Sequence, residues 1–333
     1  MDKILVTGAT GLMGANVCED LRKQGRGVRA IVRTLNTSDT RALEEIGVEI
    51  VQGDISDFQS VIKATEGVDA TIHCAAMLGG AKATYEEAWL SNIMGTETVL
   101  SAAARAGNIP VVQVITTPFF DCQGKTLYEN TPLDLTLIHS DPYGLSKRLG
   151  YTSGVTRVLS GQDIRFVIPG AIYGPSICVD RAINYAGFNN RMLNAIRGNL
   201  HTFPAMMSTY VYSKDTSEIA IKALDVGETG KNYIAHGAPE DDMFVPDWCN
   251  LISEMVGSPH RVRSITKEDS YKPEILKEFG ETNVMLLMAR EPYSVPISDA
   301  SVTHKALGTK ATTLAEGLPV TIQWLRDVGA LPN

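Results

Sequence analysis

The stretch Ile4-Leu5-Val6-Thr7-Gly8-Ala9-Thr10-Gly11-Leu12-Met13-Gly14 opens the chain as a short apolar strand that runs directly into a glycine-rich turn. The three glycines let the backbone turn tightly, approach a pyrophosphate closely and pack the next helix against the sheet. The amino terminus of that helix favours negative charge. The stretch therefore predicts a dinucleotide-binding loop, and an ordinary strand-turn-helix is the alternative. The residues expected to hold the dinucleotide here are Gly8, Thr10, Gly11, Leu12, Met13 and Gly14.

Short apolar runs rich in β-formers alternate with helical stretches over the first half of the chain. Strands are predicted at 3–7, 28–32, 48–51, 69–73, 111–116 and 164–168, each buried on both faces. The helices between them are predicted at 12–24, 57–66, 83–106 and 142–160. Buried strands separated by helices are typical of a parallel sheet with right-handed crossovers. The fold class is therefore α/β, a doubly wound Rossmann sheet.

The pattern becomes less regular after residue 168, where Pro169, Gly170, Gly174 and Pro175 cluster. Helices near 214–226, 246–256 and 314–328 and a strand near 231–235 are predicted beyond that point. We expect a dinucleotide-binding domain at 1–169, with 209–235 returning to it, and a substrate lobe at 170–208 and 236–333. Ligands of such sheets bind at the carboxyl ends of the strands, so the lobe is expected to close over that edge.

Composition narrows the class of protein. With 333 residues, 44% hydrophobic, 20% charged and a net charge of -8, the chain is expected to bind a small molecule, neither nucleic acid nor a membrane. No apolar run approaches 20 residues and no signal peptide precedes the first strand, so a cytoplasmic location is expected. The five cysteines and six histidines lack the spacing of a disulfide framework or a metal site, and no metal is predicted.

Tyr143 and Lys147 are the candidate catalytic pair. They are four residues apart at the start of a predicted helix, so their side chains share one face. A nearby ammonium stabilises a phenolate and lowers the pKa of a tyrosine toward working pH, which suits it to general acid or base work. Lysine can also donate hydrogen bonds to ribose hydroxyls. A packed tyrosine beside a solvated lysine is the alternative.

The predicted fifth strand ends in Thr116-Thr117, at the sheet edge where a substrate is expected. Thr117 is the candidate donor of a hydrogen bond to the substrate oxygen, with Thr116 close behind. Threonines also occur at strand ends for backbone reasons alone.

Seven motifs together resemble an extended short-chain dehydrogenase/reductase, a group that includes NAD(P)-dependent sugar epimerases, dihydroflavonol-type reductases and 3β-hydroxysteroid dehydrogenases. The motifs are T-G-A-T-G-L-M-G at 7–14, G-D-I-S-D at 53–57, H-C-A-A at 73–76, S-N-I-M-G-T at 91–96, Y-G-L-S-K at 143–147, P-G-A-I-Y-G-P at 169–175 and L-G-T-K-A-T-T-L-A-E-G-L at 307–318. The resemblance spans nearly the whole chain.

The resemblance implies roles for further residues. Asp54 and Ile55 would contact adenine, and Ala75 and Ala76 would line the path of the adenine ribose and pyrophosphate. Asn92 would order the central helix near the catalytic site, where it is placed with Thr117, Tyr143 and Lys147, and Pro169 would lie by the nicotinamide. A homodimer through the helices at 83–106 and 142–160 is also implied.

The second predicted strand indicates the cofactor. It ends in Val32-Arg33-Thr34, without the acidic residue that binds the 2′-hydroxyl of NAD. Arg33 stands where a cation could meet a 2′-phosphate, and the run is similar to that of dihydroflavonol-type reductases. NADP is therefore favoured and NAD stays possible, since Arg33 could simply be solvated.

The substrate class follows from a departure from the family pattern. Sugar-nucleotide members carry an arginine for the substrate diphosphate where this chain has Ser208, although Arg181, Arg191 or Arg197 could substitute. Ile168 also stands where many members have arginine. The lobe instead offers an apolar set suited to a ketone or an aromatic substrate. That set comprises Phe119, Phe120, Phe188, Phe203, Met206, Met207 and Tyr210, and it could equally be plain core.

The predicted reaction is a reversible reduction of a ketone or aldehyde by hydride from the nicotinamide. Tyr143 would protonate the alkoxide, Thr117 would hold its oxygen and Lys147 would position the ribose. A sugar-nucleotide epimerase or dehydratase that retains its cofactor is the nearest alternative, and a non-catalytic dinucleotide sensor is another.

Overall fold

A seven-stranded parallel sheet is the centre of the computed structural model, which describes residues 2–78, 84–121, 126–134, 142–281, 283, 286, 289–290 and 298–332. The strand order is β11-β6-β5-β4-β1-β2-β3, and every pair is parallel. The strands are β1 (Lys3–Thr7), β2 (Gly27–Val32), β3 (Glu49–Gln52), β4 (Ala70–His73), β5 (Val111–Val114), β6 (Ile164–Pro169) and β11 (Asn232–Ala235). The predicted α/β doubly wound fold is confirmed.

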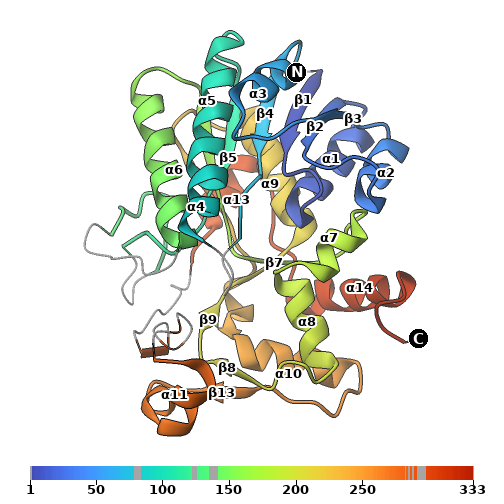
Figure 1. Cartoon of the computed structure of the whole chain (residues 1–333), viewed down its shortest axis with the longest axis vertical. Helices are drawn as coiled ribbons and strands as arrows, with labels where there is room; N and C mark the ends of the chain where they lie inside the picture. The colour runs from blue at the N-terminus through green and yellow to red at the C-terminus, as the bar shows by residue number, and fades with distance from the viewer. Residues whose placement is uncertain are drawn as a thin grey trace.

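Helices cover both faces of this sheet because side chains alternate along each strand. Leu5 points into a cluster with α3 (Phe58–Thr65) and α5 (Gly95–Arg105), whereas Ile4 and Val6 point toward α1 (Leu12–Lys23) and α9 (Ser213–Val226). Figure 1 shows α5 and α6 (Pro142–Leu159) on one side of the sheet and α1 and α2 (Ser38–Glu45) on the other. All these strand residues are fully buried, as continuous apolar runs require.

Three predictions for the first half of the chain need correction. β3 is not buried on both faces, because it is the edge strand and has a neighbour on one side only. β5 ends at Val114 instead of 116, where the chain turns toward Thr117. The long helix predicted at 83–106 is three elements, α4 (Tyr85–Ala88), the π-helix η1 (Trp89–Met94) and α5, and residue 83 lies outside the described residues. α2, which was not predicted, begins with a capping box at Thr37.

The second half of the chain adds a lobe, drawn below the sheet in Figure 1, on the side where the strands end. The strands of this lobe form three two-stranded sheets, in which β7 pairs with β10, β9 with β12 and β8 with β13. Its strands are β7 (Ala171–Tyr173), β8 (Thr202–Pro204), β9 (Met207–Ser208), β10 (Tyr210–Tyr212), β12 (Met243–Phe244) and β13 (Arg263–Ile265). The helices after β6, α9 excepted, are α7 (Val179–Asn184), α8 (Phe188–Ile196), η2 (Pro239–Asp241), α10 (Val245–Met255), η3 (Asp269–Tyr271), α11 (Pro273–Phe279), α13 (Ser301–Leu307) and α14 (Leu314–Asp327).

Aromatic packing forms the core of the lobe. The rings of Tyr210 and Trp248 stack at 4.8 Å between centroids, and Phe188 packs edge-on against both. The chain then returns to the sheet, where β11 pairs with β6 and α9 packs on α1 with Lys214 donating to Asp20 at 2.9 Å. Over the described residues, no helix has the length and apolarity needed to cross a membrane, and no three potential metal ligands gather.

Candidate active site

The glycine-rich loop between β1 and α1 is shaped by close backbone contacts. Gly8 has a φ of +69°, and a Cβ there would lie 2.6 Å from the nitrogen of Ala75. A Cβ on Gly14 would lie 2.2 Å from the carbonyl oxygen of Gly8. α1 begins after Gly11 with no side-chain cap and no acidic residue in its first turn. The helix terminus is thus left open for an anion, and the loop fits a dinucleotide pyrophosphate.

A buried hydrogen-bond network fixes the ends of β1 and β4 beside this loop. The Thr96 hydroxyl donates to the carbonyl of Asn92 at 2.7 Å, so it accepts from His73 Nε2 at 3.1 Å. His73 Nδ1 then accepts from the Thr7 hydroxyl at 2.7 Å, and Thr7 Oγ1 accepts from the amide of Ala75 at 3.2 Å. Burial, with help from the nearby Lys147 charge, lowers the pKa of His73 to about 3, which keeps the ring neutral. Sequence analysis assigned His73 no role, although it is the first residue of the H-C-A-A motif.

Lys147 is buried on α6 beneath the end of β5. Its Nζ donates to the carbonyl oxygen of Val114 at 2.7 Å. Burial lowers the pKa of this ammonium to about 8, and Cys74 opposes the change. Burial also raises the pKa of the Cys74 thiol to about 12, so the thiol stays neutral and leaves Lys147 as the charge at this point. Such perturbed groups in one place are typical of functional sites.

Tyr143 and Thr117 lie near Lys147 in the fold. Tyr143 is in the first turn of α6, one turn before Lys147, and is partly buried. Thr117 is partly buried two residues beyond the last buried residue of the β5 run, and its carbonyl accepts from the amide of Phe120 at 3.2 Å. Pro169 ends β6, the neighbouring strand. The topology therefore brings these candidates to one edge of the sheet, and their catalytic roles stay predictions.

Asn92 lies beside the start of α6, where its side chain makes three hydrogen bonds, and its catalytic role stays a prediction. It lies in the π-helix η1, 2% exposed, where its Oδ1 accepts from the amide of Met77 at 2.7 Å. Its Nδ2 donates to the carbonyl of Met77 at 3.0 Å and to Ser146 Oγ at 2.9 Å. Ser146 in turn donates to the carbonyl of Tyr143 at 3.0 Å. Asn92 therefore connects the segment after β4 to the start of α6.

α6 approaches its neighbours through small residues that sequence analysis did not single out. A Cβ on Gly150 would lie 2.8 Å from the carbonyl of Asn92, and one on Gly154 would lie 2.2 Å from Gln113 Oε1. Gln113 also donates to the carbonyl of Gly150 at 2.9 Å. The spacing of Ser146, Gly150 and Gly154 by four residues is the signal that could have indicated this close contact.

The predicted adenine contacts lie on the other side of β1. Asp54 Oδ1 accepts from the amide and the hydroxyl of Ser56, both at 2.8 Å, and thereby holds a tight turn. The carbonyl of Ile55 accepts from Thr98 on α5. Arg33 follows β2 directly and is exposed. Within the part of the chain that the structure describes, its guanidinium makes no hydrogen bond and no ion pair. Ala76, like Ala75, is partly buried after β4, and Thr10, Leu12 and Met13 lie in the loop and first turn of α1.

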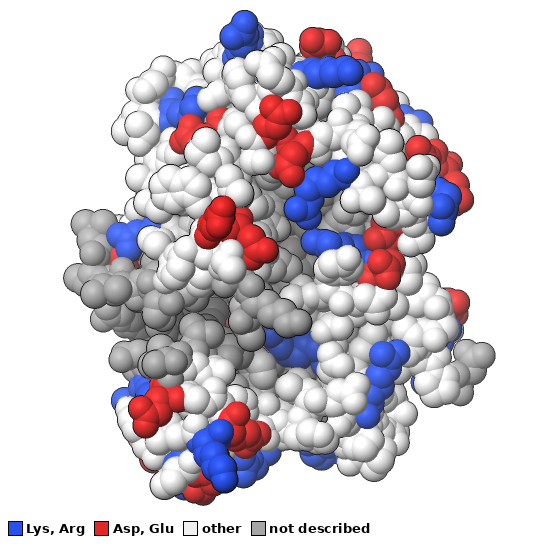
Figure 2. Space-filling model, in the orientation of Figure 1, with Lys and Arg blue, Asp and Glu red and all other residues white. Residues whose placement is uncertain are grey.

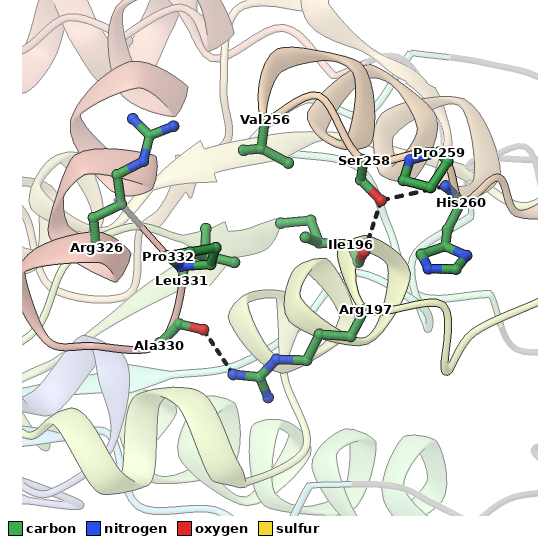
Figure 3. Close-up of a pocket in the computed structure, with 10 residues that line it drawn as sticks. All are labelled: Ile196, Arg197, Val256, Ser258, Pro259, His260, Arg326, Ala330, Leu331 and Pro332. Carbon is green, nitrogen blue, oxygen red and sulfur yellow. Dashed lines mark hydrogen bonds between the residues drawn. The ribbon is translucent and has the colours of Figure 1, made fainter.

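The three candidate substitutes for the missing diphosphate arginine lie in different places. Arg181 stacks over the ring of Tyr185 at 3.8 Å, and Tyr185 is 48% exposed. Arg197 borders a pocket of about 300 Å³ between α8, the end of α10 and the chain terminus, and it donates to the carbonyl of Ala330 at 2.7 Å (Figure 3). Arg197 is the one candidate residue among the ten that line that pocket, and none of the predicted catalytic or cofactor-binding residues lines it. Only Arg191 packs inside the aromatic core of the lobe.

The predicted lobe residues Phe203 and Tyr210 are core, at 7% and 1% exposed, and Phe119 and Phe120 are also buried. Met206, Met207 and Phe188 are partly exposed and remain available to a ligand. Ser208, at 7% exposed, pairs with Met243 in the β9–β12 ladder. Figure 2 shows basic side chains in both the upper and the lower half of this face of the molecule, with acidic ones beside several of them.

Comparison with known proteins agrees with this geometry. The sequence signature of the NAD dependent epimerase/dehydratase family matches residues 4–235. Sterol demethylase protein B of Methylococcus capsulatus is 26% identical over 343 residues, which cover 98% of this chain and 99% of the relative. The 2-alkyl-3-oxoalkanoate reductase of Stenotrophomonas maltophilia is 29% identical over 283 residues, 81% of this chain and 80% of the relative.

The fold also matches solved structures. DesIV, a dTDP-glucose 4,6-dehydratase from Streptomyces venezuelae solved with NAD and TYD bound, has a TM-score of 0.75 at 20% identity, over 98% of this chain and 97% of DesIV. Because the family signature covers well over half of the residues and the resemblance drawn from the motifs is confirmed, this chain belongs to the NAD dependent epimerase/dehydratase family, a group of extended short-chain dehydrogenase/reductase enzymes that use a nicotinamide dinucleotide.

Proposed function

We propose that the protein is an NADP-dependent oxidoreductase that reversibly reduces a ketone or aldehyde to an alcohol. The observation that carries the proposal is the position of Lys147, a buried ammonium with a lowered pKa, one helical turn after Tyr143 and at the end of the strand that leads to Thr117. A sensor that only binds a dinucleotide has no need for a buried charge there. The similarity to the 2-alkyl-3-oxoalkanoate reductase of Stenotrophomonas maltophilia supports a ketone as substrate.

The chain's own residues have distinct tasks in this reaction. The bound nicotinamide would supply hydride to the carbonyl carbon. Tyr143 donates a proton to the developing alkoxide, and the Thr117 hydroxyl donates a hydrogen bond to the same oxygen. Lys147 stabilises the tyrosinate that remains and reaches the ribose, exchanging its bond to the Val114 carbonyl for one to a hydroxyl. The carbonyl thus gains one hydride and one proton, NADPH is consumed stoichiometrically, and in the reverse direction tyrosinate takes the proton.

The first test is oxidation of NADPH and NADH by purified protein with a panel of ketones and aldehydes. Tyr143→Phe keeps the ring and removes the acidic proton, so it should lower kcat by about 10²- to 10⁴-fold and leave cofactor affinity unchanged. Wild-type turnover by this variant would refute the mechanism. Tight cofactor binding with no net oxidation of any substrate would refute the reductase.

An epimerase or dehydratase with retained cofactor is the second candidate function. The family's name and the fold shared with a dTDP-glucose dehydratase favour it. Against it, Ser208 occupies the position at which such enzymes carry an arginine for the diphosphate, and the loss of that cation would leave diphosphate charge uncompensated. Conversion of a sugar nucleotide without consumption of NADPH would establish this alternative.

The preference for NADP rests on Arg33, which is exposed beyond β2 and free of internal partners among the described residues. A charge-assisted bond to a 2′-phosphate contributes about 1.5–3 kcal/mol, so Arg33→Ala should weaken NADPH binding by roughly 10- to 100-fold. NADH binding should change little. Arg105→Ala, at the exposed end of α5, is the matched control. Equal losses for the two cofactors in Arg33→Ala would contradict the assignment.

A homodimer through α4, η1, α5 and α6 completes the proposal. Four exposed apolar side chains form a surface there that a partner would cover. They are Trp89 (54% exposed), Leu90 (47%), Met94 (39%) and Leu149 (40%). Light scattering should give a dimer for wild type and a monomer for Trp89→Glu. The control is Val226→Glu at the end of α9, outside these helices, where the side chain is 61% exposed. A monomeric wild type would refute the dimer.

A further inference from the structure

Arg191 on α8 is packed between two aromatic rings in the lobe. Its guanidinium carbon lies 4.5 Å from the centre of the Phe188 ring and 4.8 Å from that of Phe203. Arg191 as a residue is partly buried, and burial lowers the pKa of its guanidinium. Aromatic rings that contact the two faces of a guanidinium do not use its N–H donors, which point outward in the plane of the group and stay available for hydrogen bonds.

Among the described residues, no carboxylate pairs with this charge. Within the described residues Arg191 forms no ion pair and its side chain makes no hydrogen bond, and the groups that act on it electrostatically are Cys249 and Tyr210. Arg157 and Arg165, also partly buried, pair with Glu97 and Asp163. A desolvated cation is costly unless it is paired and hydrogen-bonded, so a buried guanidinium without such a partner among the described residues is suited to an anion from outside the chain.

The aromatic rings that pack around Arg191 link it to the edge of the sheet where the candidate catalytic residues lie. The Phe188 ring packs edge-on against Tyr210 at 5.8 Å. Tyr210 follows Thr209, whose carbonyl accepts from the amide of Ala171 at 2.8 Å. Ala171 comes two residues after Pro169, where β6 ends. The site of the anion and the carboxyl ends of the strands are therefore parts of one packed unit, with the partly exposed Phe188 ring adding apolar surface beside the guanidinium.

We propose that Arg191 binds a carboxylate of the carbonyl substrate, so that the substrate is an oxo acid with an apolar chain. This inference rests on the proposed reductase function and names its substrate class. A guanidinium edge matches a carboxylate through two parallel N–H···O bonds. One negative charge suits the site better than a diphosphate, because no cation among the described residues acts on Arg191 and Ser208 supplies none.

The test compares oxo acids with their methyl esters, which differ in charge alone. The panel carries the ketone at several distances from the carboxyl group and is assayed with NADPH. Wild type should have a kcat/KM for its best acid about 10- to 100-fold above that for the ester, the effect of charged hydrogen bonds. Arg191→Met should remove this preference by lowering the value for the acid and leaving that for the ester within about threefold. Arg191→Lys keeps the positive charge but lacks the two parallel N–H donors of a guanidinium, so it should recover part of the preference for the acid.

One further variant, a melting temperature and a binding measurement separate the possible failures. Arg197→Met, at the end of the same helix, should retain the acid preference. Arg191→Met should retain the melting temperature, because the change removes a desolvated charge. A drop in melting temperature with equal loss for acid and ester would mean that the arginine only supports the core. Reduction of ketones with no preference for acids would overturn the inference and leave the reductase intact.

Calorimetry decides the matter if no ketone is reduced. Binding of a medium-chain carboxylate to the NADP complex of wild type, lost in Arg191→Met, would uphold the anion site while the reductase fails. Equal binding to both proteins would overturn the site. UDP or an alkyl phosphate that binds through Arg191 more tightly than the carboxylate would show that the anion is a phosphate, which also overturns the inference.

Discussion

Replacement of Lys147 by methionine should stabilise the protein relative to wild type at neutral pH and lose that advantage in alkali. Lys147 is 8% exposed, and burial lowers its pKa from 10.5 to about 8. Keeping this ammonium charged therefore costs the folded state free energy, at a position where the proposed reaction requires a cation. Methionine has a similar length and carries no charge.

The size of the effect follows from the two pKa values. A difference of about 2.5 pH units, at about 1.4 kcal/mol for each unit, costs the folded state about 3 kcal/mol at pH 7. Because the folded pKa lies below the unfolded one, the cost is fully present below pH 8 and is relieved as pH rises toward 10.5. Between pH 7 and pH 9.5 about 2 kcal/mol of it should disappear. For 333 residues, an unfolding entropy of about 2.1 cal/mol/K per residue converts this to roughly 3 °C.

The assay is the melting temperature of the cofactor-free protein at pH 7 and pH 9.5. The difference between Lys147→Met and wild type should shrink by about 3 °C from the lower to the higher pH. The lost bond to the Val114 carbonyl gives an offset at both pH values, so the change with pH is the quantity that matters. Lys222→Met, an exposed lysine on α9, is the control. A difference that does not vary with pH would refute the conclusion that burial penalises this charge.

Three more predictions concern the loop, the central helix and the lobe. Gly14→Ala places a Cβ 2.2 Å from the carbonyl oxygen of Gly8. Denaturation should show a loss of about 1–3 kcal/mol in the free energy of unfolding, and fluorescence titration should show a loss of at least about tenfold in cofactor affinity. Asn92→Ala leaves the backbone groups of Met77 unpaired, and we expect a loss of about 1–3 kcal/mol and a fall in kcat larger than the change in KM. Burial, assisted by a neighbouring carboxylate, raises the pKa of Asp242 to about 6. The charged carboxylate therefore destabilises the folded state above that pH. Asp242→Asn should raise the melting temperature by roughly 1–2 °C at pH 8 and by less at pH 5.

Local patterns predicted the sheet well because its strands are continuous apolar runs between helices. The boundaries of β1 and α1 follow from apolar residues and from the glycines that end them. The interruption at Trp89–Met94 was not predictable, because a π-helix has the same composition as an α-helix and forms here where Asn92 reaches Met77. The short strands of the lobe are two or three residues long, too short to show a period of two.

The amino-acid sequence by itself determined the doubly wound sheet, the glycine loop and the placement of Tyr143 and Lys147 on one helix, since each depends on residues close together in the chain. Only the tertiary structure decided that Lys147 is buried against Val114, that His73 is a neutral link between Thr7 and Thr96, and that Arg191, of the three candidate arginines, packs between two aromatic rings. Most of these properties arise from contacts between residues far apart in the chain. The dielectric environment and the hydrogen-bond partners that set the charge of a side chain exist only once those segments have packed.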